Sequence, residues 1–356
     1  MVDLHLVDSS RQDPYVPARA RELMVSVWYP TADRAPMPLR PWFSERMGQV
    51  YADGLAQLAP TITGSWTLGL SHGRVDAVAD SAGGRRPIVL FSPGMGMPRE
   101  ASTAQAEDLA SHGFVVVAMS HTYESLATEF PGGRVEKSML PQTGDVDEVK
   151  AQVGQAMQVR VADTRFVLDR LADLSVGIDP DAEGHPLPSN LAGMLDLSKI
   201  AMFGHSLGGA TAAQVMHDDP RVAAGVDLDG SLWGSVLTDG LDRPFVLIGG
   251  TDHERTQDPS WQQFWSADHG PKLDFRLDGS QHHSFCDNQL ILPVLAAAGI
   301  VPADFDTEMV GTIDSRNSLD LQRGYLRTFF DTTLGRYGDI AKSPATLLHS
   351  EIILVP

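Results

Sequence analysis

A serine held at fixed spacing between two glycines is the residue of this sequence best suited to chemistry. Ser206 lies in the segment Gly-His-Ser-Leu-Gly at 204–208, the G-x-S-x-G pattern of a serine nucleophile. The apolar run 200–203 before it predicts a buried strand, and the small residues of 207–216 predict a helix. A sharp turn between the two would strain the serine backbone, and a side chain at either glycine would collide with a neighbouring element. The pattern therefore predicts that Ser206 attacks a carbonyl carbon, while the N–H of Leu207 and the positive end of the helix face the oxygen that becomes charged.

A serine of this kind needs a base to accept its proton and an acid to orient that base. In enzymes with this strand-turn-helix motif the chain order is Ser, then Asp or Glu, then His. His282 and His283 follow the strand predicted at 272–277, on a loop where the base is expected. His205, inside the motif, points the wrong way along the turn to be a base, and we interpret it as a packing residue.

Two aspartates compete for the role of the acid. Asp229 ends the strand predicted at 221–228, directly after the helix that follows the serine. Asp252 follows the next strand, predicted at 244–248, and the position usual for this fold favours it. On the residues alone, both aspartates stay open.

The residues around the histidine pair also allow a different chemistry, because His282, His283, Cys286 and Asp287 are all metal-ligand types. Adjacent histidines on a loop seldom reach one ion, however, and no second pair of ligands is evident. We expect no metal and no cofactor. Cys286 is expected to pack as a small apolar residue, and Asp287 to cap the helix that follows it.

Segments typical of strands and of helices alternate along almost the whole chain. The stretch 87–119 reads as strand, loop, helix and strand, which is the unit of a doubly wound sheet. We expect an α/β protein of the α/β-hydrolase fold, with a mostly parallel central sheet flanked by helices on both faces. A single domain over 1–356 is expected, with loop insertions around 31–86 and 121–146. The predicted strands are 22–29, 87–92, 114–119, 200–203, 221–228, 244–248 and 272–277, and the predicted helices are 44–58, 102–112, 147–174, 207–216, 261–265, 288–298 and 318–334.

The amino-acid composition limits the kinds of molecule that the protein can bind. The chain has 356 residues, of which 42% are hydrophobic, enough for the core of a sizeable globular enzyme. Its net charge of −19 argues against nucleic acid and strongly anionic membranes as partners. No apolar run is long enough for a transmembrane segment. No signal peptide is evident, so the compartment stays open between secretion, if a leader has been removed ahead of Met1, and the cytoplasm.

Several motifs in the same order resemble those of the plasma-type platelet-activating factor acetylhydrolases, also called lipoprotein-associated phospholipases, and their bacterial relatives. The matching segments are Val-Trp-Tyr-Pro at 27–30, Phe-Ser-Pro-Gly-Met-Gly at 91–96, Asp-Leu-Ala-Ser-His-Gly-Phe at 108–114, the serine motif extended to 211, Asp-Leu-Asp at 227–229 and Gly-Ser-Gln-His at 279–282.

The resemblance implies the site residues beyond Ser206. It implies Asp229 as the acid, His282 as the base, and the N–H groups of Met95 and Leu207 as the oxyanion hole. One departure is Pro93, where the family usually has a histidine. Proline has no N–H, but the oxyanion donor implied in this loop is Met95, so the hole is unaffected.

The function expected is that of a serine esterase or acyl hydrolase. The resemblance implies short acyl groups on phospholipid-like esters, with a small molecule or lipid as the partner of the site. A cutinase-like lipase or polyester hydrolase shares the same machinery and would place Asp252, in place of Asp229, beside the base. Alternatives from other classes are an acyltransferase, which would need a pocket that excludes water, and a non-catalytic binding protein on a hydrolase scaffold.

Overall fold

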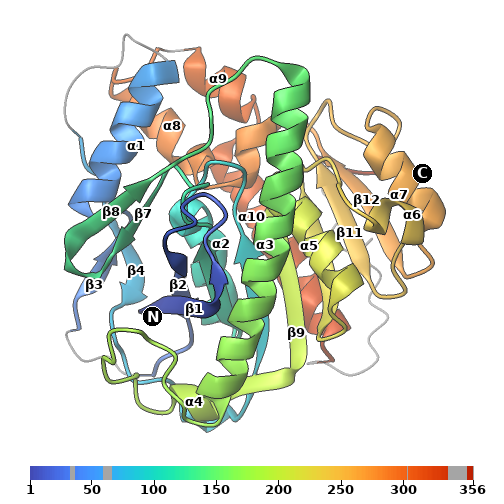
Figure 1. The fold of residues 1–356 in the computed structure, drawn as a ribbon. Coiled ribbons are helices and arrows are strands. Elements are labelled where there is room, and N and C mark those ends of the chain that lie inside the picture. Colours follow the sequence, from blue (N-terminus) through green and yellow to red (C-terminus); the bar gives the residue numbers. More distant parts are fainter. Residues whose placement is uncertain (33–36, 59–65, 303, 336–350, 356) are drawn as a thin grey trace.

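A large sheet crosses the whole molecule (Figure 1). The computed structural model describes residues 1–32, 37–58, 66–302, 304–335 and 351–355. Within these residues the sheet has nine strands in the order β1-β2-β6-β5-β9-β10-β11-β12-β13. Their bounds are β1 (Val2–Gln12), β2 (Ala20–Trp28), β5 (Arg86–Ser92), β6 (Val115–Ser120), β9 (Leu195–His205), β10 (Val222–Leu228), β11 (Phe245–Gly249), β12 (Lys272–Leu277) and β13 (Ile352–Leu354).

The centre of the sheet is parallel. The strands β6, β5, β9, β10, β11 and β12 pair in parallel, and the antiparallel strands β1, β2 and β13 lie at its two edges. All six residues of β6 are buried, as expected for a parallel strand covered on both faces. The expectation of a mostly parallel sheet is confirmed.

Helices cover both faces of the sheet. Along β5, Ile88 and Leu90 pack into a core shared with α3 (Val146–Ser175) and α5 (Leu207–Asp218). The alternate residues Val89 and Phe91 pack into a second core under α2 (Thr103–Ser111) and α10 (Ser315–Thr333). Strand side chains point alternately to opposite faces, so one strand contributes to both cores. The remaining elements are β3 (Leu39–Pro41), α1 (Glu45–Leu58), β4 (Leu70–Arg74), η1 (Ser81–Gly83), η2 (Arg99–Ser102), β7 (Ala127–Phe130), η3 (Pro131–Gly133), β8 (Arg134–Lys137), α4 (Leu191–Met194), α6 (Val236–Asp239), α7 (Pro259–Ala267), η4 (His282–Phe285), α8 (Asn288–Ala297) and α9 (Phe305–Val310).

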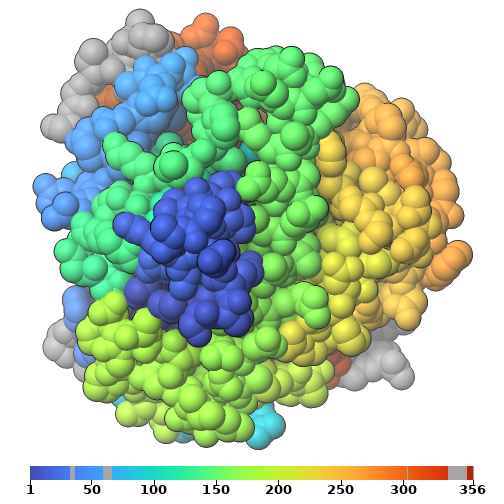
Figure 2. All heavy atoms as spheres, in the orientation of Figure 1, coloured from blue at the N-terminus to red at the C-terminus, as the bar shows by residue number. Residues whose placement is uncertain are grey.

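Two regions expected to be loops contain regular structure. Residues 121–146 hold the hairpin β7–β8, whose four-residue strands are too short to show a period. Residues 31–86 hold α1, which the sequence predicts, and the small sheet of β3 and β4; residues 33–36 and 59–65 of this stretch lie outside the described part. Strand β1 is a further element absent from the expectations. It pairs with β2 and lies beside α3 on the surface (Figures 1 and 2), where Arg11 forms an ion pair with Asp163 of α3 at 2.6 Å.

The turn between β9 and α5 has the strained geometry that the two glycines imply. Ser206 has φ +56° and ψ −127°, a backbone conformation that L-residues rarely adopt. A Cβ added at Gly204 would lie 2.1 Å from the backbone of Gly208, and one added at Gly208 would lie 1.9 Å from the carbonyl oxygen of Ser92. The steric reason for both glycines is therefore confirmed.

Replacing Gly208 with alanine is expected to lower the free energy of unfolding by about 1–3 kcal/mol or more, because the added methyl group meets backbone atoms that cannot rotate away. Gly154, inside α3, is the matched control, since a Cβ there meets nothing within 4 Å. Gly154→Ala is expected to raise the same free energy by up to about 1 kcal/mol, the helix preference of alanine over glycine. Urea denaturation of both variants measures the difference, and equal stabilities would contradict the steric account.

Candidate active site

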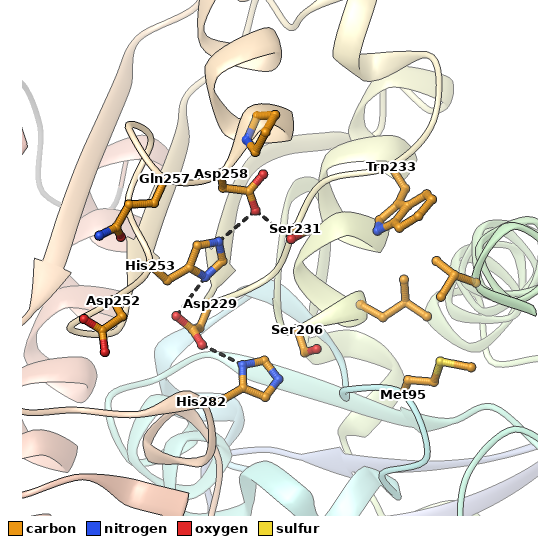
Figure 3. A pocket seen from close by; sticks show the side chains of 13 residues that line it. Met95, Ser206, Asp229, Ser231, Trp233, Asp252, His253, Gln257, Asp258 and His282 are labelled. Atoms are coloured by element: carbon orange, nitrogen blue, oxygen red, sulfur yellow. Dashed lines mark hydrogen bonds and ion pairs between the residues drawn. The ribbon is translucent and has the colours of Figure 1, made fainter. Parts of the chain in front are cut away.

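A cavity of about 580 Å³ opens at the carboxyl ends of the parallel strands (Figure 3). Ligands of open α/β sheets bind at this edge, because the loops that follow the strands converge there. The loops after β5, β9, β10 and β11 each contribute to the walls. The lining residues are Met95, Val153, Ser206, Leu207, Asp229, Ser231, Trp233, Asp252, His253, Gln257, Asp258, Pro259 and His282.

The residues Ser206, Met95 and Leu207 all line this cavity, and Figure 3 shows Ser206 and Met95 on the same wall. Ser206 stands at the tip of the turn before α5, half-buried and open to the cavity. Leu207 is the first residue of α5, and the N–H groups of a first helical turn lack acceptors within the helix. Met95, the other donor that the resemblance implies, comes from the loop after β5. A carbonyl oxygen bound beside Ser206 would therefore face this wall.

Asp229 and His282 form a hydrogen bond across the cavity floor. The Nδ1 atom of His282 lies 2.6 Å from Oδ2 of Asp229. Asp229 is buried, and its backbone also lies at positive φ, +61°. Burial alone would raise the pKa of the Asp229 carboxyl, but hydrogen bonds from His253 and His282 hold that pKa well below its ordinary value. The carboxylate is thus charged at neutral pH.

The other ring nitrogen of His282 remains available. Its Nε2 makes no hydrogen bond to any residue that the structure describes, and in Figure 3 it faces the side of the cavity where Ser206 lies. The side chain is 46% exposed, so substrate can approach it. The three residues of the expected triad are therefore gathered around one cavity.

Asp252, the rival acid, lies at the rim of the same cavity. Its side chain is exposed and makes no hydrogen bond or ion pair with the described residues. The carboxylate that bonds to His282 is that of Asp229.

Two further histidines surround His282. The ring of His205 packs on that of His282 with centroids 4.6 Å apart, and its Nε2 lies 2.9 Å from the carbonyl oxygen of His282. His205 thus packs as expected and also holds the backbone of His282. His283 does not line the cavity and accepts a hydrogen bond from Asn288 at 3.0 Å, and burial together with the nearby His282 lowers its pKa to about 4.

The expectation that Asp287 caps the helix that follows it is wrong. Asp287 precedes α8, but its side chain makes no cap hydrogen bond there. Its carboxylate instead accepts the N–H groups of Thr103 and Ala104, at the start of α2, at 2.7 and 3.2 Å. A contact with a helix distant in sequence leaves no local pattern. Cys286 is buried, as expected, and among the described residues no cluster of three or more side chains suited to a metal ion is found.

The sequence analysis missed His253, which binds the same carboxylate as His282. Its Nδ1 lies 3.0 Å from Oδ1 of Asp229, and its Nε2 lies 2.9 Å from Oδ2 of Asp258. Burial would lower the pKa of His253, but the two carboxylates raise it to about 10, so the ring is positively charged at neutral pH. A histidine next to Asp252, in a loop already considered for the acid, was the available signal.

Arg160 of α3 is a second residue that the sequence analysis missed. Its guanidinium donates to the carbonyl oxygens of Pro93 and Gly94, at 2.5 and 3.1 Å, and pairs with Glu124. All of these contacts are buried. Arg160 therefore fixes the loop that carries Met95.

Comparisons with known proteins identify related esterases and acetylhydrolases. Residues 12–341 match the family described as platelet-activating factor acetylhydrolase, isoform II. A probable 1-alkyl-2-acetylglycerophosphocholine esterase of Arthroderma benhamiae is 28% identical over 96% of this chain and 88% of its own length. The platelet-activating factor acetylhydrolase of Canis lupus familiaris is 29% identical over 71% of this chain, and the matched part spans 58% of that relative.

A solved structure supports the fold. The ferulic acid esterase from Streptomyces cinnamoneus superposes with a TM-score of 0.78 at 33% sequence identity, covering 100% of this chain and 95% of the esterase. No helix in the described part of the chain is long and apolar enough to cross a membrane. With the family matched over most of the sequence, the chain belongs to the platelet-activating factor acetylhydrolase, isoform II, family and is a carboxylic ester hydrolase of the α/β-hydrolase fold.

Proposed function

We propose that this esterase cleaves short-chain acyl esters of phospholipid-like substrates through an acyl-enzyme on Ser206. The observation that carries the proposal is the 2.6 Å hydrogen bond between Asp229 and His282 at the cavity that Ser206 also lines. Asp229 would hold the imidazole in the tautomer with Nδ1 protonated, which leaves Nε2 free to accept the serine proton.

The reaction would proceed in two halves. The Oγ of Ser206 attacks the ester carbonyl carbon as its proton passes to Nε2 of His282. The tetrahedral intermediate then collapses, and His282 returns the proton to the departing alcohol. Water, activated by the same nitrogen, attacks the acyl-enzyme and releases the carboxylic acid and free Ser206.

The N–H groups of Met95 and Leu207 are proposed as the donors to the oxyanion of the tetrahedral intermediate that forms in each half of the reaction. Each such donor is worth about 3 kcal/mol of transition-state stabilisation. The contacts of Arg160 with Pro93 and Gly94 support this assignment, because they keep the loop of Met95 in one conformation before substrate arrives.

His282 is a better candidate for the base than His253, although both contact Asp229. Both nitrogens of His253 are hydrogen-bonded to carboxylates, and its ring is protonated at neutral pH. A protonated imidazole with no free nitrogen cannot accept the proton of Ser206. Nε2 of His282 is free and faces Ser206 (Figure 3).

The proposed substrate class rests on the names of the related esterases and on the lining of the cavity. The relative from Arthroderma benhamiae is named for an acetyl ester of an alkyl glycerophosphocholine, which supports a short acyl group here. A second candidate is an aromatic acyl ester, supported by the likeness to the ferulic acid esterase and by Trp233 in the cavity wall.

An ester series distinguishes the two. We expect p-nitrophenyl acetate and butyrate to be hydrolysed faster than the palmitate, and a phospholipid with an acetyl group at its second position to be cleaved. Methyl ferulate is expected to react more slowly than the acetyl phospholipid. Hydrolysis of methyl ferulate without cleavage of the phospholipid would transfer the assignment to aromatic acyl esters.

Replacing Asp229 with asparagine is expected to lower kcat by about 10⁴-fold without unfolding the protein, because the amide no longer holds His282 in the reactive tautomer. Asp252→Asn, at the rim of the same cavity, should not show this loss. Steady-state kinetics with p-nitrophenyl acetate measures both. A loss confined to Asp252→Asn would give the acid role to Asp252 and move the protein toward cutinase-like lipases.

A further inference from the structure

A row of alternating carboxylates and imidazoles leads away from Ser206. His282 contacts Oδ2 of Asp229, Oδ1 of Asp229 contacts Nδ1 of His253, and Nε2 of His253 contacts Asp258 (Figure 3). The three hydrogen bonds measure 2.6, 3.0 and 2.9 Å. The proposed triad therefore continues by two further charged groups.

We propose that His253 is a positioning residue that fixes the Asp229 carboxylate. As a second, positively charged histidine, it also offsets part of the negative charge that this carboxylate presents to His282. The inference rests on the proposed function, in which Asp229 and His282 are the acid and the base.

The positioning effect follows from how the two oxygens of Asp229 are shared. Oδ1 receives the N–H of Gly250 at 2.6 Å as well as the ring of His253. Two donors on one oxygen oppose rotation of the carboxylate, so that Oδ2 is left facing His282. Asp229 itself lies at positive φ, a strained backbone conformation that persists only where surrounding contacts hold it.

His253 is itself held in a fixed plane. Its ring stacks on Trp261 of α7 at 4.3 Å between centroids, and the indole N–H of Trp261 donates to the carbonyl oxygen of Gly230 at 2.6 Å. The same tryptophan thus ties the ring to the loop that carries Asp229. Asp258 accepts a hydrogen bond from the other ring nitrogen of His253, and it also caps α7 by accepting the N–H of Ser260.

The electrostatic effect follows from the charges around His253. The carboxyl groups near it are Asp227, Asp229, Asp258 and Asp274. Burial raises the pKa of Asp227 well above its ordinary value and that of Asp274 to about 6, whereas hydrogen bonds hold the pKa values of Asp229 and Asp258 below their ordinary range, so these two are fully ionised at neutral pH. A cation on the far oxygen of Asp229 offsets part of the negative field of that carboxylate at His282.

The decisive experiment replaces His253 with asparagine in the full-length protein. The asparagine amide can still donate to Asp229, but the positive charge and the link to Asp258 are lost. We expect kcat to fall about tenfold or more, because Asp229 is less firmly held. We also expect the acid limb of the pH profile of kcat/KM to move to higher pH by about half a unit or more, since the negative charge of Asp229 next to His282 is then no longer offset by a cation.

Asp258→Asn tests the charge of His253 by changing the other carboxylate that binds its ring. Its amide nitrogen would face Nε2 of His253 and favour the neutral ring, while the bond from Nδ1 to Asp229 remains. The acid limb should move in the same direction but less far, because the negative charge of Asp258 disappears as well. Should His253→Asn fail to fold, this variant carries the test alone.

His217 provides the matched control. It also lies between two aspartates, Asp218 at 2.7 Å and Asp239 at 3.1 Å, but it does not line the cavity. His217→Asn is expected to leave both kcat and the acid limb unchanged. A wild-type kcat and acid limb in His253→Asn, or an equal shift in His217→Asn, would overturn the inference. Activity retained after loss of Ser206 or His282 would instead remove the proposed function, so the two failures are distinguishable.

Discussion

Replacing Ser206 with alanine is expected to abolish ester hydrolysis and to leave the fold intact. The loss in kcat should be about 10⁴-fold or more, because no acyl-enzyme can form. The side chain of Ser206 makes no hydrogen bond to the described residues, and the strained turn depends on its neighbouring glycines, so alanine removes the hydroxyl and little else.

The measurement combines kinetics with covalent labelling. An organophosphate should add its mass to one peptide of the wild type, the one that contains Ser206, and to none in the variant. Ser198, an exposed serine on the same strand β9, supplies the matched control variant Ser198→Ala, which should react and hydrolyse as the wild type does. Full activity in Ser206→Ala with labelling at another residue would refute the serine mechanism.

The second large effect is expected at His282. His282→Ala should lower kcat by about 10⁴-fold or more, because no other group can accept the proton of Ser206. His283→Ala should keep most of the activity, since His283 does not line the cavity and binds Asn288. Activity assays of the two variants at several pH values make the comparison.

The same pair of variants tests the register of the loop. The backbone of His282 is tied to His205 by a hydrogen bond at 2.9 Å, so a shift of one residue would have to break that contact. If His283→Ala proved the more damaging, His283 would be the base and the assignment of the loop would be wrong by one position.

Local signals were sufficient for the turn around Ser206. Its steric requirements involve residues within a few positions of one another, and Gly204 and Gly208 record them directly in the sequence. The central strands were also predictable, because a buried parallel strand such as β6 is a continuous apolar run. Short strands such as β7 leave too few residues for a period to show.

The choice between Asp229 and Asp252 could not be made from composition or spacing, and it depended on the resemblance to a family. The aspartate that lies next to His282 is determined by how β10 and β11 pair. Leu228 lies opposite Ile248, so the residue after β10 meets the loop after β11. That same pairing brings His253 to Asp229, and it explains why considering Asp252 by itself missed the neighbouring imidazole.

The buried position of Arg160 could not be predicted from the sequence for a different reason. It lies in the middle of the 30-residue helix α3, where an arginine is normally expected on the solvent face. Its burial depends on Glu124 and on the carbonyl groups of the loop after β5, none of which is near it in sequence.

The charged ring between Asp229 and Asp258 has a consequence for folding as well as for catalysis. An unfolded chain releases the proton of a histidine near pH 6.5, whereas in the native protein burial opposes the charge of His253 but the two carboxylates retain it to about pH 10. Between these values the native state binds a proton that the unfolded state does not, so this contribution to stability is complete below pH 6.5 and is lost as pH rises toward 10. Folding in mildly alkaline solution therefore takes up a proton at His253, and the heat of that step includes the ionisation enthalpy of whatever buffer supplies it.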